Sequence, residues 1–135
     1  MNKIKINKIL KKKGKKQIVC LTAYSSTMAK ILDKYCDIIL VGDSVSMVLY
    51  GMKTTRDIKI ETLILHAKAV KKICRRSLVV FDIPYKTYTN KFAAYKNAKR
   101  VINLTKCDAV KLEGGEKVVK IIKHLVKKKI PVLGH

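Results

Sequence analysis

Short runs of β-branched and apolar residues alternate with longer segments of helical period along almost the whole chain. The runs are QIVCLTAY (17–24), DIILVGD (37–43), LVVFD (78–82), DAVKLE (108–113) and IPVLGH (130–135). Apolar strands separated by helices are typical of parallel sheets that helices cover. No linker rich in proline, glycine or serine divides the pattern. We therefore expect one α/β domain over residues 17–135, preceded by a basic N-terminal segment over residues 1–16.

Helical periodicity predicts four helices between these strands, each with one buried face. The first, capped at Ser25 or Ser26, should bury Met28, Ile31, Leu32 and Tyr35, and the second, over 61–76, Leu63, Ala67, Val70 and Cys74. The third, opening at Thr89 or Asn90, should bury Ala94, Ala98, Val101 and Thr105, and the fourth Val118, Ile121, Ile122 and Leu125. The Gly114-Gly115 pair before the fourth helix could cradle a phosphate, but a tight turn is the favoured interpretation.

Two architectures fit this alternation. A doubly wound sheet of five strands would be complete in 135 residues, whereas a TIM (β/α)₈ barrel needs about 250 and would be half present. The chain halts directly after the fifth strand, with no helix to cover it. This favours the N-terminal portion of a TIM barrel, with five strands and four helices. Its first and fifth strands would have open edges, so we expect it to aggregate or to depend on a partner.

A net charge of +22 attracts polyanions of any kind. Only Arg56, Arg75, Arg76 and Arg100 among the 31 basic residues are arginines, although base and phosphate recognition favours arginine. The lysines are spread over every predicted helix. We therefore expect no specific nucleic-acid function, and a non-catalytic basic module that binds polyanions such as RNA remains the alternative.

The compartment of the protein and the state of its cysteines can be predicted from three features that we do not find in the sequence: membrane-spanning segments, a secretory signal and clustered cysteines. No apolar run approaches the ~20 residues of a membrane-spanning helix, and no secretory signal follows the basic N-terminus. We expect a cytoplasmic protein with no membrane partner. Cys20, Cys36, Cys74 and Cys107 are widely scattered, so they are interpreted as buried thiols and not as zinc ligands.

Three of the nine acidic residues fall at the ends of predicted strands: Asp43, Asp82 and Glu113. Active sites of parallel α/β folds assemble at this edge of the sheet. Strand alternation places Lys111 on the same face as Glu113. Carboxylates held by separate strands suit a hard divalent ion such as Mg²⁺. An acid at a strand end can instead cap the next helix, and a lysine can reach out to the rim, but three acids at equivalent positions favour a site.

Six segments carry a family resemblance: LTAYSS, ILVGDSVSMVLYG, HAKAV, DIPY, DAVKLEGGE and PVLGH. In this order and spacing they resemble the N-terminal half of the ketopantoate hydroxymethyltransferase family. The resemblance implies a barrel of the pyruvate- and phosphoenolpyruvate-binding type. It also implies transfer of a hydroxymethyl group from 5,10-methylenetetrahydrofolate to 3-methyl-2-oxobutanoate. The product, 2-dehydropantoate, leads to pantothenate and coenzyme A.

The resemblance also implies roles for individual residues. Asp43, Asp82 and Glu113 match the metal-binding residues of the family, which assist enolate formation through Mg²⁺. Asp43, Ser44, Asp82 and Lys111 match residues that hold the keto acid. His135 matches a histidine near the same site, although a terminal histidine can equally be frayed.

Further implications concern activity and assembly. The family's general-base glutamate lies beyond these residues, so no catalytic residue is assigned and we expect little activity from this chain alone. The resemblance implies a homo-oligomer, a decamer built from rings. Ser25 and Tyr85 stand where the family usually has aspartate and phenylalanine.

Overall fold

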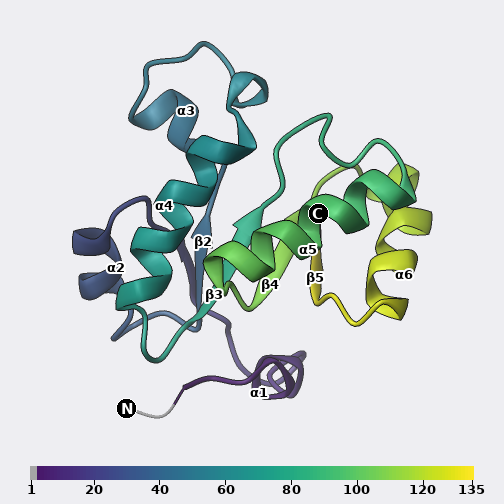
Figure 1. Cartoon of the computed structure of the whole chain (residues 1–135). Coiled ribbons are helices and arrows are strands. Elements are labelled where there is room, and N and C mark those ends of the chain that lie inside the picture. Colours follow the sequence, from purple (N-terminus) through teal and green to yellow (C-terminus); the bar gives the residue numbers. More distant parts are fainter. Residues whose placement is uncertain (1–2) are drawn as a thin grey trace.

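Five parallel strands form one sheet in the order β1-β2-β3-β4-β5 in a computed structural model that describes residues 3–135 (Figure 1). The strands are β1 Cys20–Thr22, β2 Ile38–Val41, β3 Leu78–Asp82, β4 Ala109–Leu112 and β5 Val132–Gly134. A doubly wound sheet reverses its strand order part-way across. Here each crossover adds the next strand on the same side, as in a barrel. The sequential order therefore decides between the two predicted architectures, in favour of part of a (β/α)₈ barrel.

Helices cover one face of the sheet. The α-helices are α1 Ile6–Leu10, α2 Ser26–Leu32, α3 Val45–Val48, α4 Ile60–Ile73, α5 Lys91–Thr105 and α6 Val119–Lys127, and two 3₁₀ turns are η1 Thr55–Asp57 and η2 Gly115–Val118. Buried residues of α2, α4, α5 and α6 form one core with the outward-facing strand residues, among them Ile39, Phe81 and Val110. Neighbouring helices lie side by side in chain order, as Figure 1 shows for α4, α5 and α6.

The opposite face corresponds to the inside of the barrel. Ile38, Leu78, Val80 and Ala109 form a second, smaller apolar cluster there, joined by Ile4 from the N-terminal segment. This segment packs across the end of the sheet where the strands begin, with α1 below the sheet in Figure 1. The predicted basic segment 1–16 thus contacts the sheet. Its residues 1–2 lie outside the described residues, and the division at residue 16 stays a prediction.

The predictions for α4 and α5 are confirmed. The side chain of Asn90 accepts hydrogen bonds from the backbone N–H groups of Phe92 and Ala93 and so caps α5. The predicted faces of the two helices are buried: Leu63, Ala67, Val70 and Cys74 for α4, and Ala94, Ala98, Val101 and Thr105 for α5. Both helices sit between two neighbouring helices, so their apolar faces are covered as the periodicity predicts.

The predictions at the β1 edge were partly wrong. The predicted cap Ser25 is confirmed and Leu32 packs against the core, but Met28 and Ile31 of α2 and Tyr35 beyond it are exposed. This helix has seven residues and packs mainly on α4, so part of its apolar surface stays exposed. Cys20, predicted to be buried, is exposed for the related reason that β1 pairs only with β2.

Two further differences concern element lengths. The predicted first strand, 17–24, narrows to Cys20–Thr22, the three residues that pair with Ile38–Leu40. The connection between β2 and α4, for which no helix was predicted, contains α3 and η1. No helix within residues 3–135 is long and apolar enough to cross a membrane.

Candidate active site

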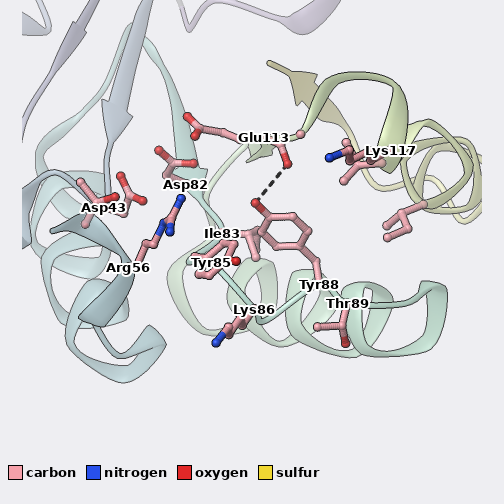
Figure 2. Close-up of a pocket in the computed structure, with 14 residues that line it drawn as sticks. Asp43, Arg56, Asp82, Ile83, Tyr85, Lys86, Tyr88, Thr89, Glu113 and Lys117 are labelled. Carbon is pink, nitrogen blue, oxygen red and sulfur yellow. Dashed lines mark hydrogen bonds between the residues drawn. The ribbon is translucent and has the colours of Figure 1, made fainter.

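Three carboxylates meet in one pocket at the carboxyl edge of the sheet. Asp43 follows β2, Asp82 ends β3 and Glu113 follows β4, and all three line a pocket of about 540 Å³ (Figure 2). The loop after β3 and the first turns of the chain after Gly114 supply the other walls. The prediction that acids from three successive strands share one edge of the sheet is therefore confirmed.

Lys111 joins two of these acids. It stands directly opposite Asp82 in the register of β4 and β3, and its Nζ donates a hydrogen bond of 3.0 Å to Oδ2 of Asp82. The same ammonium donates to Oε1 of Glu113. Burial alone would lower the pKa of Lys111, but its contacts with Glu113 and Asp82 raise it. The lysine is thus a buried cation inside the site and does not reach out to the rim.

The acids differ in how readily they ionise. Burial raises the pKa of Asp82 to about 6, and the charges of Asp43 and Glu113 add to this while Lys111 opposes it. Burial also raises the pKa of Asp43, with the charge of Glu113 adding to the effect. The hydrogen bond from Lys111 lowers the pKa of Glu113. Burial thus disfavours the charged forms of Asp43 and Asp82, and a bound cation would favour them.

The acids at the opposite edge of the sheet have a structural role. Asp33 accepts hydrogen bonds from the backbone N–H groups of Arg75, Arg76 and Ser77. These bonds outweigh burial and lower the pKa of Asp33. Asp37 accepts hydrogen bonds from Lys12 and one backbone N–H group, and Asp108 accepts them from two lysines and one backbone N–H group. These acids tie loops together. At α3, by contrast, the N-cap Ser44 makes no side-chain hydrogen bond to the backbone of the helix.

The donor set fits a divalent cation in its chemistry. Three carboxylates from separate strands supply hard oxygen ligands of the kind that Mg²⁺ takes. Within residues 3–135, however, no three His, Cys, Asp or Glu side chains are gathered into a ready-made metal site. Instead, the ammonium of Lys111 lies against two of the acids. The metal-binding roles of Asp43, Asp82 and Glu113 therefore stay predictions.

Ser44 and His135 lie beside the pocket. The Oγ of Ser44 is 2.7 Å from the hydroxyl of Tyr24. The Nδ1 of His135 is 3.2 Å from Oε1 of Glu113, and its backbone N–H donates to the carbonyl of Leu112. The backbone of His135 is thus tied to β4 and is not frayed.

The Gly114-Gly115 pair forms a tight turn. Both residues have positive φ, and both backbone N–H groups donate to the carbonyl of His135. Because these N–H groups are already engaged, they are not free for a phosphate. The favoured sequence interpretation is confirmed.

Sequence reasoning missed five residues at the mouth of the pocket, Arg56, Tyr85, Lys86, Tyr88 and Lys117, which we call the mouth residues. The guanidinium carbon of Arg56 lies 4.8 Å from the centre of the Tyr85 ring. The Tyr88 hydroxyl donates to the backbone carbonyl of Glu113. In Figure 2 Arg56 lies near Asp43 and Asp82, and the ammonium of Lys117 points toward Tyr88. Loop residues of this kind carry no periodic signal. Arg56 could still have been noticed, because arginine is rare in this lysine-rich chain.

A comparison with protein families adds the decisive observation. The family model described as ketopantoate hydroxymethyltransferase matches residues 3–135. The chain belongs to the ketopantoate hydroxymethyltransferase family. Curated relatives agree with this assignment. A 3-methyl-2-oxobutanoate hydroxymethyltransferase of Pelagibacter ubique (strain HTCC1062) is 51% identical over 135 residues, which are 100% of this chain and 52% of the relative.

Another relative of the same name, from Anaplasma marginale (strain Florida), is 52% identical over 124 residues, covering 92% of this chain and 45% of the relative. The chain thus spans about half the length of the ketopantoate hydroxymethyltransferases it matches. Nothing in these matches supports the alternative of a non-catalytic polyanion-binding module.

Solved structures give the same fold. The chain resembles 2,3-dimethylmalate lyase, a member of the PEP mutase/isocitrate lyase superfamily, with a TM-score of 0.63 at 13% identity over 87% of this chain and 46% of that one. It also resembles phosphonopyruvate hydrolase in complex with oxalate and Mg²⁺, with a TM-score of 0.66 at 12% identity over 82% of this chain and 39% of that one. At such low identity the likeness concerns the fold alone: the open sheet of this chain corresponds to about half of a TIM barrel.

Proposed function

We propose that this chain carries the keto-acid and metal-binding part of a ketopantoate hydroxymethyltransferase. The reaction transfers a hydroxymethyl group from 5,10-methylenetetrahydrofolate to 3-methyl-2-oxobutanoate and gives 2-dehydropantoate, a precursor of pantothenate. The observation that supports it best is the pocket lined by Asp43, Asp82 and Glu113, the last two of which pair with Lys111. The relatives' names supply the substrate.

In this proposal Asp43, Asp82 and Glu113 hold Mg²⁺. The raised pKa values of Asp43 and Asp82 support it, because a bound cation would stabilise the charged forms that burial, and to a lesser extent the neighbouring acids, disfavour. A structural neighbour, phosphonopyruvate hydrolase, was solved with Mg²⁺ and oxalate, which is compatible with such a site. When bound, the ion supplies positive charge that polarises the keto group and makes the adjacent C–H bond more acidic.

The protein's own side chains bind and orient the keto acid. Lys111 offers a buried positive charge to the carboxylate of the substrate, and a charge buried in this way acts more strongly than one in water. The Ser44 hydroxyl, fixed by Tyr24, retains hydrogen-bonding capacity for a substrate oxygen. His135 lies within reach of Glu113 and helps to orient that carboxylate. None of these residues is assigned the removal of the substrate proton.

The mouth residues suit the one-carbon donor. The pocket, at about 540 Å³, is in the range that takes drug-sized ligands and exceeds the needs of a short keto acid. Arg56, Lys86 and Lys117 are in no ion pair with another of residues 3–135. Cations that are free to pair would bind the carboxylates of the glutamate tail of 5,10-methylenetetrahydrofolate. We further propose a cytoplasmic homo-oligomer, as in the ring-built decamer that the family resemblance implies.

A binding experiment tests the function in the chain as it stands. Isothermal titration calorimetry should detect binding of 3-methyl-2-oxobutanoate in the presence of Mg²⁺, and chelation of the ion by EDTA should abolish it. Asp82→Asn should abolish it as well. The control Asp57→Asn makes the same chemical change at an exposed acid outside the pocket and should bind like the wild type. Equal binding with Mg²⁺ and with EDTA would refute the metal-dependent function.

A further inference from the structure

A chain of hydrogen bonds runs from helix α4 to Ser44. The Nδ1 of His66, on α4, is 2.6 Å from the backbone carbonyl oxygen of Tyr24. The hydroxyl of that tyrosine is 2.7 Å from the Oγ of Ser44. On its other side, the Nε2 of His66 is 2.7 Å from the hydroxyl of Tyr50. Three separate segments of the chain are thus joined through one imidazole.

The partners of His66 fix its tautomer. A carbonyl oxygen only accepts hydrogen bonds, so Nδ1 must carry the proton that is donated to Tyr24. In the neutral imidazole Nε2 then accepts from the hydroxyl of Tyr50. The two rings also meet edge to face, with centroids 5.8 Å apart and planes at 69°. The carbonyl of Tyr24 thus fixes the tautomer, and Tyr50 helps to hold the orientation of the imidazole.

The segment that His66 holds lies at the edge of the sheet. Tyr24 follows the edge strand β1, which pairs with β2 alone, and precedes Ser25, the N-cap of α2. The Tyr24 side chain is nevertheless 6% exposed. The backbone turn at Tyr24 sets the direction in which this buried ring enters the molecule. A shift of the carbonyl would therefore move the hydroxyl at the far end of the ring.

Ser44 has little freedom of its own. A Cβ atom placed on Gly42 would come within 3.0 Å of the Ser44 Oγ, so the hydroxyl packs tightly against the strand end. Its bond to Tyr24 is the only hydrogen bond of its side chain with another of residues 3–135. The position of Oγ thus depends on Tyr24, and Tyr24 depends on His66.

We propose that His66 is a positioning residue for the keto-acid site. It binds the carbonyl of Tyr24 and so places the tyrosine hydroxyl that orients Ser44, without touching the substrate itself. This inference rests on the proposed function, because it takes Ser44 as a keto-acid ligand. Tyr50, whose hydroxyl is hydrogen-bonded to the Nε2 of His66, supports the imidazole in this role.

Two substitutions at His66 separate this role from general stability. The amide nitrogen of asparagine can take the place of Nδ1, whereas that of glutamine takes the place of Nε2. His66→Gln should lose the bond to Tyr24 and weaken the Kd for 3-methyl-2-oxobutanoate, measured with Mg²⁺, about fivefold. His66→Asn should keep the bond and bind within about twofold of the wild type. His124→Gln, at a histidine that contacts Phe92 and Tyr95 instead, is the matched control and should have no effect.

A double-mutant cycle tests whether His66 acts through Ser44. In a Ser44→Ala background His66→Gln should cause no further loss of affinity, because the oriented hydroxyl is already gone. Tyr50→Phe should weaken binding in the wild-type background, and less than His66→Gln does.

Two other results would overturn the inference while the proposed function stands. One is that His66→Gln weakens keto-acid binding about fivefold in the Ser44→Ala background as well as in the wild type. The other is equal weakening by His66→Asn and His66→Gln. A wild-type chain that fails to bind the keto acid at all would instead refute the proposed function, and the inference with it.

Discussion

Lys111 and Asp82 face each other across neighbouring strands, as Cα partners in the register of β4 and β3 with Nζ and Oδ2 3.0 Å apart. Both side chains are buried on the face that corresponds to the inside of the barrel. A buried ion pair is weak evidence for stability by itself, but removal of one partner leaves the other unpaired. We therefore expect a substitution in this pair to lower the free energy of unfolding much more than a substitution in an ion pair on the surface.

Lys111→Met should lower the free energy of unfolding by about 3 kcal/mol, because Asp82 and Glu113 lose their shared cation. Arg100→Met is the control, since Arg100 pairs with Glu61 on the surface, where a pair contributes roughly 0.2–1 kcal/mol. Urea unfolding of both variants measures the difference. Equal losses would show that Lys111 does not compensate the acids.

The pH dependence of stability should carry a signature of Asp82. Its pKa is raised from 3.8 to about 6 by burial, so the folded state holds this proton more tightly than the unfolded state does. The stabilisation is fully present below about pH 4 and is lost as the pH rises through about 6.

Asp82→Asn removes this titration, whereas Lys111 stays charged throughout. The free energy of unfolding of the variant minus that of the wild type should therefore increase from about pH 4 to about pH 6 and then level off. Denaturant titrations at several pH values measure it. A difference that stays constant over this range would contradict the raised pKa of Asp82.

Asp33 should matter for stability and not for the site. Asp33→Ala leaves three backbone N–H groups, those of Arg75, Arg76 and Ser77, without their acceptor. The expected loss is about 2–4 kcal/mol, with unchanged keto-acid affinity under conditions where the variant is folded. Asp57→Ala, at an exposed acid, is the control for unfolding. If Asp33→Ala had normal stability but bound the keto acid poorly, Asp33 would belong to the site, and its structural role would be refuted.

Gly42→Ala tests the tight packing at Ser44. The new Cβ would lie 3.0 Å from the Ser44 Oγ and would displace it, so the Kd for the keto acid should rise severalfold. Gly134→Ala is a suitable control, because its Cβ would meet only the flexible end of Ile122 at 3.5 Å. Calorimetric titration of both variants is the measurement, and matching affinities would argue against a precisely placed hydroxyl.

Local sequence patterns predicted the parts of the fold that neighbours enclose. The faces of α4 and α5 followed from periodicity because each helix packs between two others. The face of α2 did not follow, since Ile31 and Tyr35 have no neighbouring element at the β1 edge. The order of the strands in the sheet could not be predicted either, because an apolar run does not show which strands pair with each other.

The candidate site divides in the same way. Strand ends placed Asp43, Asp82 and Glu113 correctly, since parallel strands bring their ends to one edge. Alternation on β4 placed Lys111 on the same face as Glu113, whereas its contact with Asp82 depends on the register of β3 and β4. His66 was missed as a site residue because its role depends on a loop carbonyl, and the positions of Arg56 and Lys117 depend on loop conformations that no period encodes.

Metal binding tests the central claim most directly. Mn²⁺, a divalent ion with similar ligand preferences to Mg²⁺, can be followed by electron paramagnetic resonance as it leaves the free pool. The account predicts that the wild-type chain binds one Mn²⁺, more tightly with 3-methyl-2-oxobutanoate present, that Mg²⁺ displaces it, and that Asp43→Asn and Asp82→Asn abolish binding while Asp57→Asn does not. Wild-type affinity in the Asp43 and Asp82 variants would contradict the assignment of these acids as the metal site.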